Sequence, residues 1–516
     1  MQQRKINRSG QSVNYILPSP IGGLNARDSL DLMPETDAIV MDNYLPLDTK
    51  VALRKGYSRY VLAEKKIETL VEYTSPGKNH LFAFGMGTVF DISSKVGVKD
   101  YEKDFSENNW QACQFKNYLI LVNGTDTPQT FYIADGKEHF EDLNFSGDGL
   151  NAKRLINVCV SKQRLFFVEK GSLNFWYSEG VGEVQGTLKK FDLSTIARDG
   201  GELVACACWT QDGGQGIDDL TVFITSRGEV MVYQGTDPSS ANGWALKGTF
   251  RMSAPLGYRC ILPYQGDLII ISEDGYVPLS KALPLNKANA SQIAFSDKIR
   301  GLFLNRAQAN HKKQGWQGIL YSRGGYAIFN VPVSQQFEQH VINTNTGAWC
   351  RFTNIPALCW GLFQGRLYFG SKDGVFLFDD GYSDAGVHIK GKIAQAYSNL
   401  GSNNLKKIQM LNPRTKSSTK YALVVYANVD FDDKERDYVE NIGYSGLTKW
   451  QESKWSSLSN QIGTKWATLK GKIRSQWIGS SATGFKISLV FQTKTRGNLI
   501  EWYDTGFRYE QGRGIL

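Results

Sequence analysis

Long apolar runs are missing from this chain of 516 residues. No stretch of about 18 apolar residues occurs, so the sequence predicts no membrane insertion. The N-terminal segment MQQRKINRSGQSVNY is polar and charged and lacks the apolar centre of a secretory signal. We therefore expect a protein that is made and kept in the cytosol.

Cysteine and histidine are also scarce, and neither forms a metal-binding pattern. The seven cysteines are odd in number and contain no CxxC pair, which argues against a disulfide framework or a zinc site. The five histidines form no HExxH or His–Cys cluster. The sequence therefore predicts no metal and no cofactor.

What the chain does contain is glycine, with 52 residues against only 14 prolines. Many glycines with few prolines are typical of tight turns between short strands. The hydrophobic fraction of 41% is that of a globular protein able to bury a large core. The net charge of +9 is uneven, because residues 401–516 carry 18 Lys and Arg against 10 Asp and Glu.

One pattern recurs through the middle of the chain: an apolar strand, a glycine turn, and a strand rich in aromatic and β-branched residues. Its copies begin at Leu81, Leu119, Leu165, Leu220, Leu268, Ile319 and Leu367. Each copy is typical of a β-hairpin, and hairpins repeated at a spacing of roughly 40–50 positions indicate propeller blades of four strands. A further strand precedes most copies and contains six of the seven cysteines, which we interpret as small buried side chains.

These patterns predict an all-β protein with three parts. Residues 1–60 form an extended N-terminal strap and assembly segment, with a short helix possible over Glu35–Tyr44. Residues 61–385 form a β-propeller of six to eight blades, for which an array of β-sandwiches is the alternative. Residues 386–516 form a basic, Trp-rich, β-sandwich-like domain, or else a closing blade with an insertion that includes the long segment 449–466.

Catalytic motifs are absent from the sequence. No GxSxG elbow and no Walker A sequence occurs, and the glycine-rich residues 213–216 predict a loop. Glycosidases built on propellers need two carboxylates, and the turns 273–275 and 372–374 carry acids. The Asp-Gly pairs in these turns are common in hairpins. We expect no enzymatic activity.

A basic cluster near the C-terminal end could face nucleic acid, since phosphate contacts require Lys and Arg. The alternative is an ordinary solvated surface, which we favour because exposed lysines are common. The candidate DNA-facing residues are Lys406, Lys407, Arg414, Lys416 and Lys420.

The strap contains a recognisable order of motifs. PIGGLNARD at residues 20–28 is followed by Met33-Pro34, Asp37-Ala38, Asp42-Asn43-Tyr44, Pro46 and LRKGY at residues 53–57. This order resembles the opening of the tail nozzle, or packaged-DNA stabilisation, family of short-tailed bacteriophages, with Lys55 where Arg or Pro is expected. The candidate assembly residues are Gly22, Gly23, Leu24, Asn25, Asp28, Pro34, Asp37, Ala38, Asn43, Tyr44, Pro46, Arg54, Gly56 and Tyr57.

The resemblance implies a non-enzymatic virion component of the tail, present in the host cytoplasm during assembly. Family members carry a propeller and form a homohexameric ring below the portal and adaptor. Double-stranded DNA is retained by this ring and then passes through its channel. The alternative functions are a glycan-binding or glycan-hydrolysing tail propeller that contacts a receptor, and a WD-type cytosolic scaffold. The scaffold ranks last because its Trp-Asp and Gly-His signatures are missing.

Overall fold

The structure, a computed structural model, describes residues 12–212, 217–240, 242–282, 294–334, 336–418, 421–437 and 472–512. The chain divides into two compact units, each built from separate segments of the sequence. One unit comprises residues 59–340 and 354–378, and the other comprises residues 1–58, 341–353 and 379–516. The described residues contain no helix that is long and apolar enough to cross a membrane.

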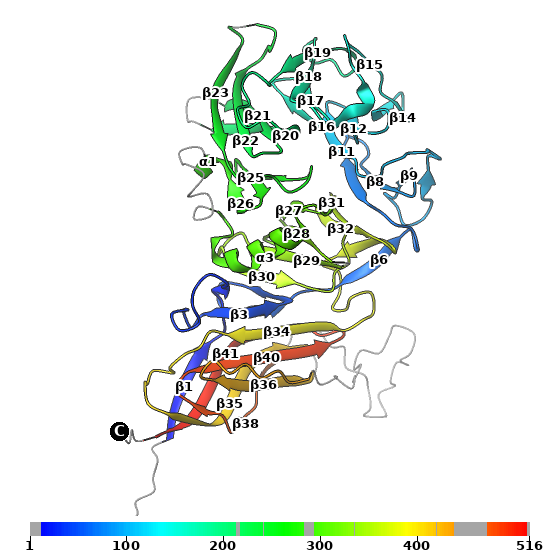
Figure 1. The fold of residues 1–516 in the computed structure, drawn as a ribbon. Coiled ribbons are helices and arrows are strands. Elements are labelled where there is room, and N and C mark those ends of the chain that lie inside the picture. Colours follow the sequence, from blue (N-terminus) through cyan, green and yellow to red (C-terminus); the bar gives the residue numbers. More distant parts are fainter. Residues whose placement is uncertain are drawn as a thin grey trace, which may run out of the picture. The chain divides into compact units, whose positions relative to one another are not determined.

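The unit formed by residues 59–340 and 354–378 is a β-propeller (Figure 1). Its sheets follow one another in chain order, and consecutive strands within a sheet pair antiparallel, as β11 to β14 do. The first two sheets contain β7 (Thr69–Tyr73), β8 (His80–Gly85), β9 (Thr88–Asp91) and β10 (Lys99–Asp100), then β11 (Gln111–Phe115), β12 (Tyr118–Val122), β13 (Gln129–Ala134) and β14 (Lys137–Asp142).

The next sheets continue this order. One contains β15 (Phe145–Ser146), β16 (Leu155–Ser161), β17 (Arg164–Glu169), β18 (Asn174–Ser178) and β19 (Gly186–Asp192), with the 3-10 helix η1 (Ala152–Arg154) before β16. The following sheets contain β20 (Leu203–Asp212), β21 (Ile217–Thr225), β22 (Glu229–Gly235) and β23 (Trp244–Arg251), then β24 (Ile261–Tyr264), β25 (Asp267–Ser272) and β26 (Gly275–Pro278).

Helices follow β26 in the chain. They are α1 (Leu279–Ala282), η3 (Asp297–Ile299) and α3 (Arg300–Asn310), and β27 (Gln317–Tyr321), β28 (Tyr326–Val333) and β29 (Gln336–Asn343) come next. The last sheet has the order β31 (Cys359–Phe363), β32 (Arg366–Ser371), β33 (Gly374–Phe378) and β6 (Tyr57–Val61). A strand from the start of the chain thus completes the last sheet, which closes the ring without leaving β33 as an open edge.

Apolar side chains fill the space between neighbouring sheets. The strands β8, β17 and β33 are buried at every position, because both of their faces pack against other sheets. Aromatic rings make many of these contacts: Phe175 lies 4.3 Å from Phe223, and Phe166 stacks on Trp244 at 5.5 Å. Each such buried ring stabilises the fold by about 1.5–3 kcal/mol. The predicted propeller, with six to eight blades, is confirmed.

The predicted hairpins are all present, although one differs in its position within the sheet. Six correspond to a sheet's second and third strands, whereas the copy from Ile319 corresponds to β27 and β28. The cysteine-containing strands precede the hairpins as the innermost strands β11, β16, β20 and β31, with Cys260 just before β24. The sequence repeat therefore predicts correctly which strands pair as hairpins. It does not predict which strand of each sheet lies nearest the propeller axis.

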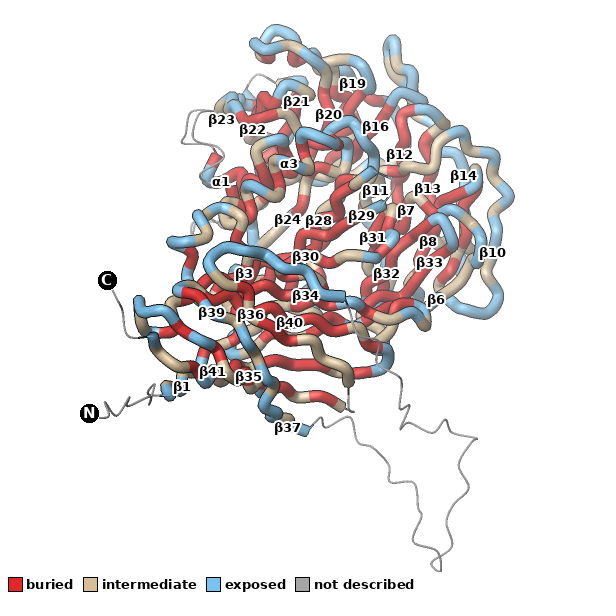
Figure 2. Tube along the Cα trace, turned by 60° about the horizontal axis from the view of Figure 1, so that its bottom comes forward, coloured by how far each residue is buried: buried red, intermediate tan, exposed pale blue. Residues whose placement is uncertain are grey.

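The second unit is a two-layer β structure, as predicted for the C-terminal region. One sheet contains β1 (Ser12–Pro18), β4 (Tyr44–Pro46), β5 (Val51–Leu53), β35 (Lys406–Ser417), β37 (Lys472–Ser475), β38 (Ile478–Gly479), β39 (Thr483–Gly484) and β41 (Ile500–Gln511). The other strands are ordered β30 (Trp349–Phe352), β2 (Gly23–Leu24), β3 (Asp37–Asp42), β34 (Ile389–Gln395), β40 (Ile487–Thr495) and β36 (Leu423–Val429). Figure 2 shows β34 and β40 buried along most of their length.

Two details of the strap differ from the sequence-based expectation. The helix expected over Glu35–Tyr44 is wrong, because Asp37–Asp42 forms β3, which pairs with β2 and β34. The strap is also not a separate segment, since β1 pairs with β41 over residues 12–18. Such long-range pairing leaves no local signal in the sequence. The loop at residues 213–216 and the segment 449–466 lie outside the described residues.

Candidate functional sites

The first half of the strap motif forms a polar turn inside its own unit. The Asn25 amide donates to Asp28 and to Asp37, with both distances 2.8 Å, and the Asn25 oxygen accepts from the backbone of Arg27 and Asp28. Gly23 has a φ of +82°, and a Cβ there would lie 2.5 Å from the Trp349 carbonyl oxygen. Glycine is therefore required here for both its conformation and its small size.

The second half of the motif centres on a buried ion pair. The Arg54 guanidinium binds the Asp384 carboxylate through two hydrogen bonds of 2.8 and 2.7 Å, and both side chains are almost fully buried. Arg54 Nε also donates to Asn43, whose own amide donates to Thr353 and to the Lys390 carbonyl. Burial raises the pKa of Asp384, while the paired guanidinium acts in the opposite direction. Arg54 thus connects the start of the chain to segments that lie much later in the sequence.

Most other motif residues are also buried within the chain. Only Gly22, Asp28 and Pro34 retain appreciable exposure, and the buried members are Gly23, Leu24, Asn25, Asp37, Ala38, Asn43, Tyr44, Pro46, Arg54, Gly56 and Tyr57. The motif is therefore the internal frame of one unit. An intermolecular role for these residues stays a prediction, because their polar groups are already occupied inside the chain.

The predicted basic cluster does not form one exposed stripe. Lys406 is fully buried, its ammonium donates to the carbonyls of Asn404 and Phe485, and burial lowers its pKa. The prediction that Lys406 faces DNA is therefore wrong, because β35 directs this side chain into the interior. Arg414 pairs with Asp504, and Lys416 pairs with Glu501 at 3.3 Å.

The remaining basic candidates are Lys407 and Lys420. Lys407 is exposed and has no ion pair to the described part of the chain. Lys420 lies outside the described residues.

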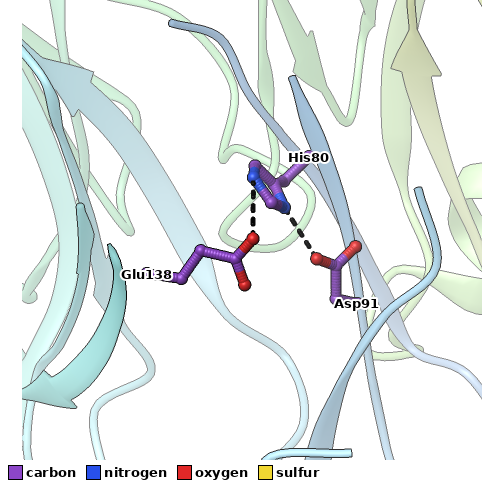
Figure 3. A group of neighbouring side chains, drawn as sticks. All are labelled: His80, Asp91 and Glu138. Atoms are coloured by element: carbon purple, nitrogen blue, oxygen red, sulfur yellow. Dashed lines mark hydrogen bonds and ion pairs between the residues drawn. The ribbon is translucent and has the colours of Figure 1, made fainter. Parts of the chain in front are cut away.

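A cluster that the sequence did not reveal joins the first two propeller sheets. His80 on β8 is fully buried, with its Nδ1 atom 2.6 Å from Asp91 on β9 and its Nε2 atom 3.7 Å from Glu138 on β14 (Figure 3). The three ligand atoms lie close enough together for a metal ion. Because the three residues come from separate strands and are widely spaced in the sequence, no short motif could have indicated them.

Charge balance argues against a cation at this cluster. Two ammonium groups, Lys78 and Lys99, already bind the Glu138 carboxylate, and Ser93 hydrogen-bonds Asp91. A divalent ion would add positive charge beside two lysines. Burial raises the pKa of Asp91, but hydrogen bonds from His80 and Ser93 outweigh it and hold the pKa below its ordinary value. The cluster is best described as an ionic contact between two sheets.

A cavity of about 520 Å³ lies among the inner strands of the propeller. Residues of β7, β11, β16, β20, β24 and β27 line it, including the thiols of Cys113, Cys159, Cys206 and Cys208. Burial raises the pKa of Cys113 to about 12 and raises the pKa of Cys208. These two thiols are therefore neutral at physiological pH and are poor nucleophiles.

Arg259 is the cation that borders this cavity. It precedes β24 and donates to the Glu68 carbonyl, the Thr69 hydroxyl and the Trp110 carbonyl, which belong to segments of the first two sheets. Its side chain therefore spans from one side of the ring to the other. Burial lowers the pKa of Arg259.

The acidic turns considered for glycan hydrolysis lie in separate sheets. Asp274 is in the turn between β25 and β26, where it accepts from Ser253, and Asp373 is in the turn between β32 and β33. Both carboxylates thus occupy ordinary hairpin turns, in agreement with the turn interpretation of these sequences.

Comparison with known proteins assigns no family to the chain. Neither a protein-family profile nor a curated protein sequence matches the chain. Among solved structures, the chain is similar to a candidate 6-phosphogluconolactonase from Bacteroides fragilis NCTC 9343. The identity is 10%, the match covers 64% of this chain and 91% of the other, and the TM-score is 0.34. At this level the similarity says nothing about activity.

Proposed function

We propose that this protein is a structural tail component of a short-tailed bacteriophage, of the nozzle or packaged-DNA stabilisation type. The observation that carries the proposal is the order of strap motifs from Pro20 to Tyr57. The resemblance implies a propeller, and the chain has one. In this proposal six copies form a ring below the portal and adaptor, DNA passes along the ring's channel, and the chain performs no catalysis.

The architecture of the chain supports a mechanical role. A closed propeller has few open strand edges and a tightly packed interior, so it resists deformation. The last sheet is completed by β6, and β1 pairs with β41, so both ends of the described chain are held in sheets. A ring of identical subunits needs contacts between two different surfaces of each copy.

The distribution of charge supports passage of DNA rather than tight binding. Each phosphate contact increases affinity, so a channel wall that carries many free cations would hold DNA in place. Arg414 and Lys416 are partly neutralised by acids, and Lys406 is enclosed. Weak, transient and sequence-independent contact is the behaviour that such a surface favours.

Electron microscopy of the purified full-length chain, alone and with its portal and adaptor, tests this proposal. We expect a ring with six-fold symmetry, and mass spectrometry of purified virions should detect the chain as a tail constituent. A glycan array and a glycan hydrolysis assay test the alternative of a glycan-binding or glycan-hydrolysing propeller. Both should give no signal. Absence of the chain from virions, or a monomer that binds or cleaves glycans, would contradict the proposal.

A further inference from the structure

The central cavity of the propeller is bordered by a cation, Arg259, that no described carboxylate contacts directly. Arg259 makes three hydrogen bonds, two to backbone carbonyls and one to the Thr69 hydroxyl, and it forms no ion pair with any described carboxylate. A guanidinium has five N–H donors, so two remain after these bonds. A partly buried charge of this kind is costly without a partner.

The nearest acids are engaged elsewhere. Glu68 binds Lys66 at 2.7 Å, and Glu107 accepts bonds from the backbone and side chain of Asn109. Glu72 also lines the cavity, but its carboxylate accepts from the Gln364 backbone. It lies further along β7 than Thr69, by roughly 10 Å of extended strand. Glu68 and Glu107 attract the guanidinium through space, but no carboxylate of the described residues makes a direct hydrogen-bonded ion pair with it.

The cavity has the size and lining of a small-molecule site. Its volume of about 520 Å³ falls within the roughly 300–1,000 Å³ that is typical of ligand pockets. Its lining includes apolar residues such as Val158 and Ala205 and the polar residue Gln111. Tyr258, beside Arg259, is 40% exposed, so this part of the lining reaches solvent.

We propose that this cavity binds a small organic acid of sugar size, whose carboxylate or phosphate group pairs with Arg259. The acid supplies the direct ion pair that the described residues do not provide, and it accepts hydrogen bonds from the two remaining N–H groups of the guanidinium. Its uncharged part fills the space among the inner strands. This site is independent of the proposed role in a phage tail.

Isothermal titration of the full-length chain tests the site, with glucose 6-phosphate, glucuronate, inorganic phosphate and neutral glucose as probes. We expect saturable binding of at least one of the two sugar acids, which identifies the charged group, and at least tenfold weaker binding of glucose. Equal binding of glucose and the acids would overturn the proposal. Binding of inorganic phosphate with no binding of either sugar acid would overturn it as well.

Arg259→Gln should weaken binding of the sugar acid at least tenfold, because the amide keeps hydrogen-bonding capacity but not charge. Arg323→Gln is the matched control, since Arg323 is exposed and does not line the cavity. The affinity of this variant for the sugar acid should equal that of the unmodified chain. If Arg259→Gln fails to fold, Arg259→Lys keeps the charge and should bind three- to tenfold more weakly. Unchanged affinity in the Arg259 variant that folds would refute the site.

Discussion

At the scale of single residues, the strap motif is defined by side chains that cannot be exchanged without disturbing the interior. Arg54 is the clearest case, because its carboxylate partner Asp384 lies 330 positions later in the chain. Removing one partner of a buried ion pair leaves the other charge without compensation. Arg54 and Asp384 therefore depend on each other inside their unit.

Arg54→Met should lower the free energy of unfolding by about 3–5 kcal/mol, because Asp384 would remain buried and unpaired. Lys486→Met is the matched control in the same unit, since Lys486 pairs with the well-exposed Asp31 at 3.0 Å. An exposed pair contributes only about 0–1 kcal/mol. Urea unfolding of both variants measures the difference, and equal losses would contradict the assigned role of Arg54.

Acid should weaken the contact between Asp91 and His80 in the first propeller sheet. The pKa of Asp91 is lowered in the folded state, so its contribution to stability is present above the unfolded value of about 4 and is lost as the pH falls through the lowered folded pKa. Asp91→Asn should therefore show a shallower loss of stability below about pH 4, with a lower stability at neutral pH.

Urea unfolding between pH 3 and pH 7 measures this effect. Asp135→Asn, at an exposed turn in the second sheet, should reproduce the profile of the unmodified chain. If Asp91→Asn loses stability in acid as steeply as the unmodified chain, Asp91 does not carry the effect.

At the scale of the elements, hairpins were predictable and their long-range partners were not. A glycine turn between apolar strands is a local signal, so β8–β9, β17–β18 and β32–β33 follow from the sequence. The strand β3 instead shows Pro34 before an apolar segment, which locally resembles a helix start. Its pairing with β34, a strand far away in the sequence, decides the outcome.

The same limit applies to the candidate sites. The His80 cluster and the Arg259 cavity each combine residues from different sheets, so neither has a sequence motif. Lys406, in contrast, belongs to a visible cluster of basic residues, but such a cluster on a strand does not show which side chains point inward. The sequence shows that these residues are basic. Which of the side chains face solvent is known only from the register of β35 in its sheet.

The contact between β6 and the last propeller sheet can be tested at one glycine. Gly374 has a φ of +117°, and a Cβ there would lie 2.3 Å from the Leu62 carbonyl oxygen, just after β6. Gly374→Ala should therefore cost about 1–2 kcal/mol for the backbone conformation and about 1–3 kcal/mol more for the clash. Proteolysis near residues 57–66 should accelerate, because β6 would detach more often.

Gly365→Ala in the same sheet is the matched control, since Gly365 has a φ of +69° but no atom within 4 Å of the added Cβ. This variant should show only the conformational cost and unchanged proteolysis near β6. Thermal unfolding and limited proteolysis of both variants measure the difference. Equal effects would show that the Leu62 contact does not hold β6 in place.

At the scale of the whole molecule, the chain consists of two units that share no simple boundary in sequence. The propeller is interrupted by residues 341–353, and the other unit collects three separate segments. Composition and repeats identified the propeller and the β-rich C-terminal region. They could not assign residues 12–53 to that region, because a strand's partners are not encoded in its own residues.

The late completion of the last sheet also has a consequence for biosynthesis. The strand β6 (Tyr57–Val61) leaves the ribosome long before β33 (Gly374–Phe378), its partner in the sheet. At roughly 5–20 residues per second, this early strand waits for about 15 to 60 seconds with its backbone groups unpaired. We therefore expect slower translation or reduced chaperone access during that interval to lower the fraction of newly made chain that closes its ring.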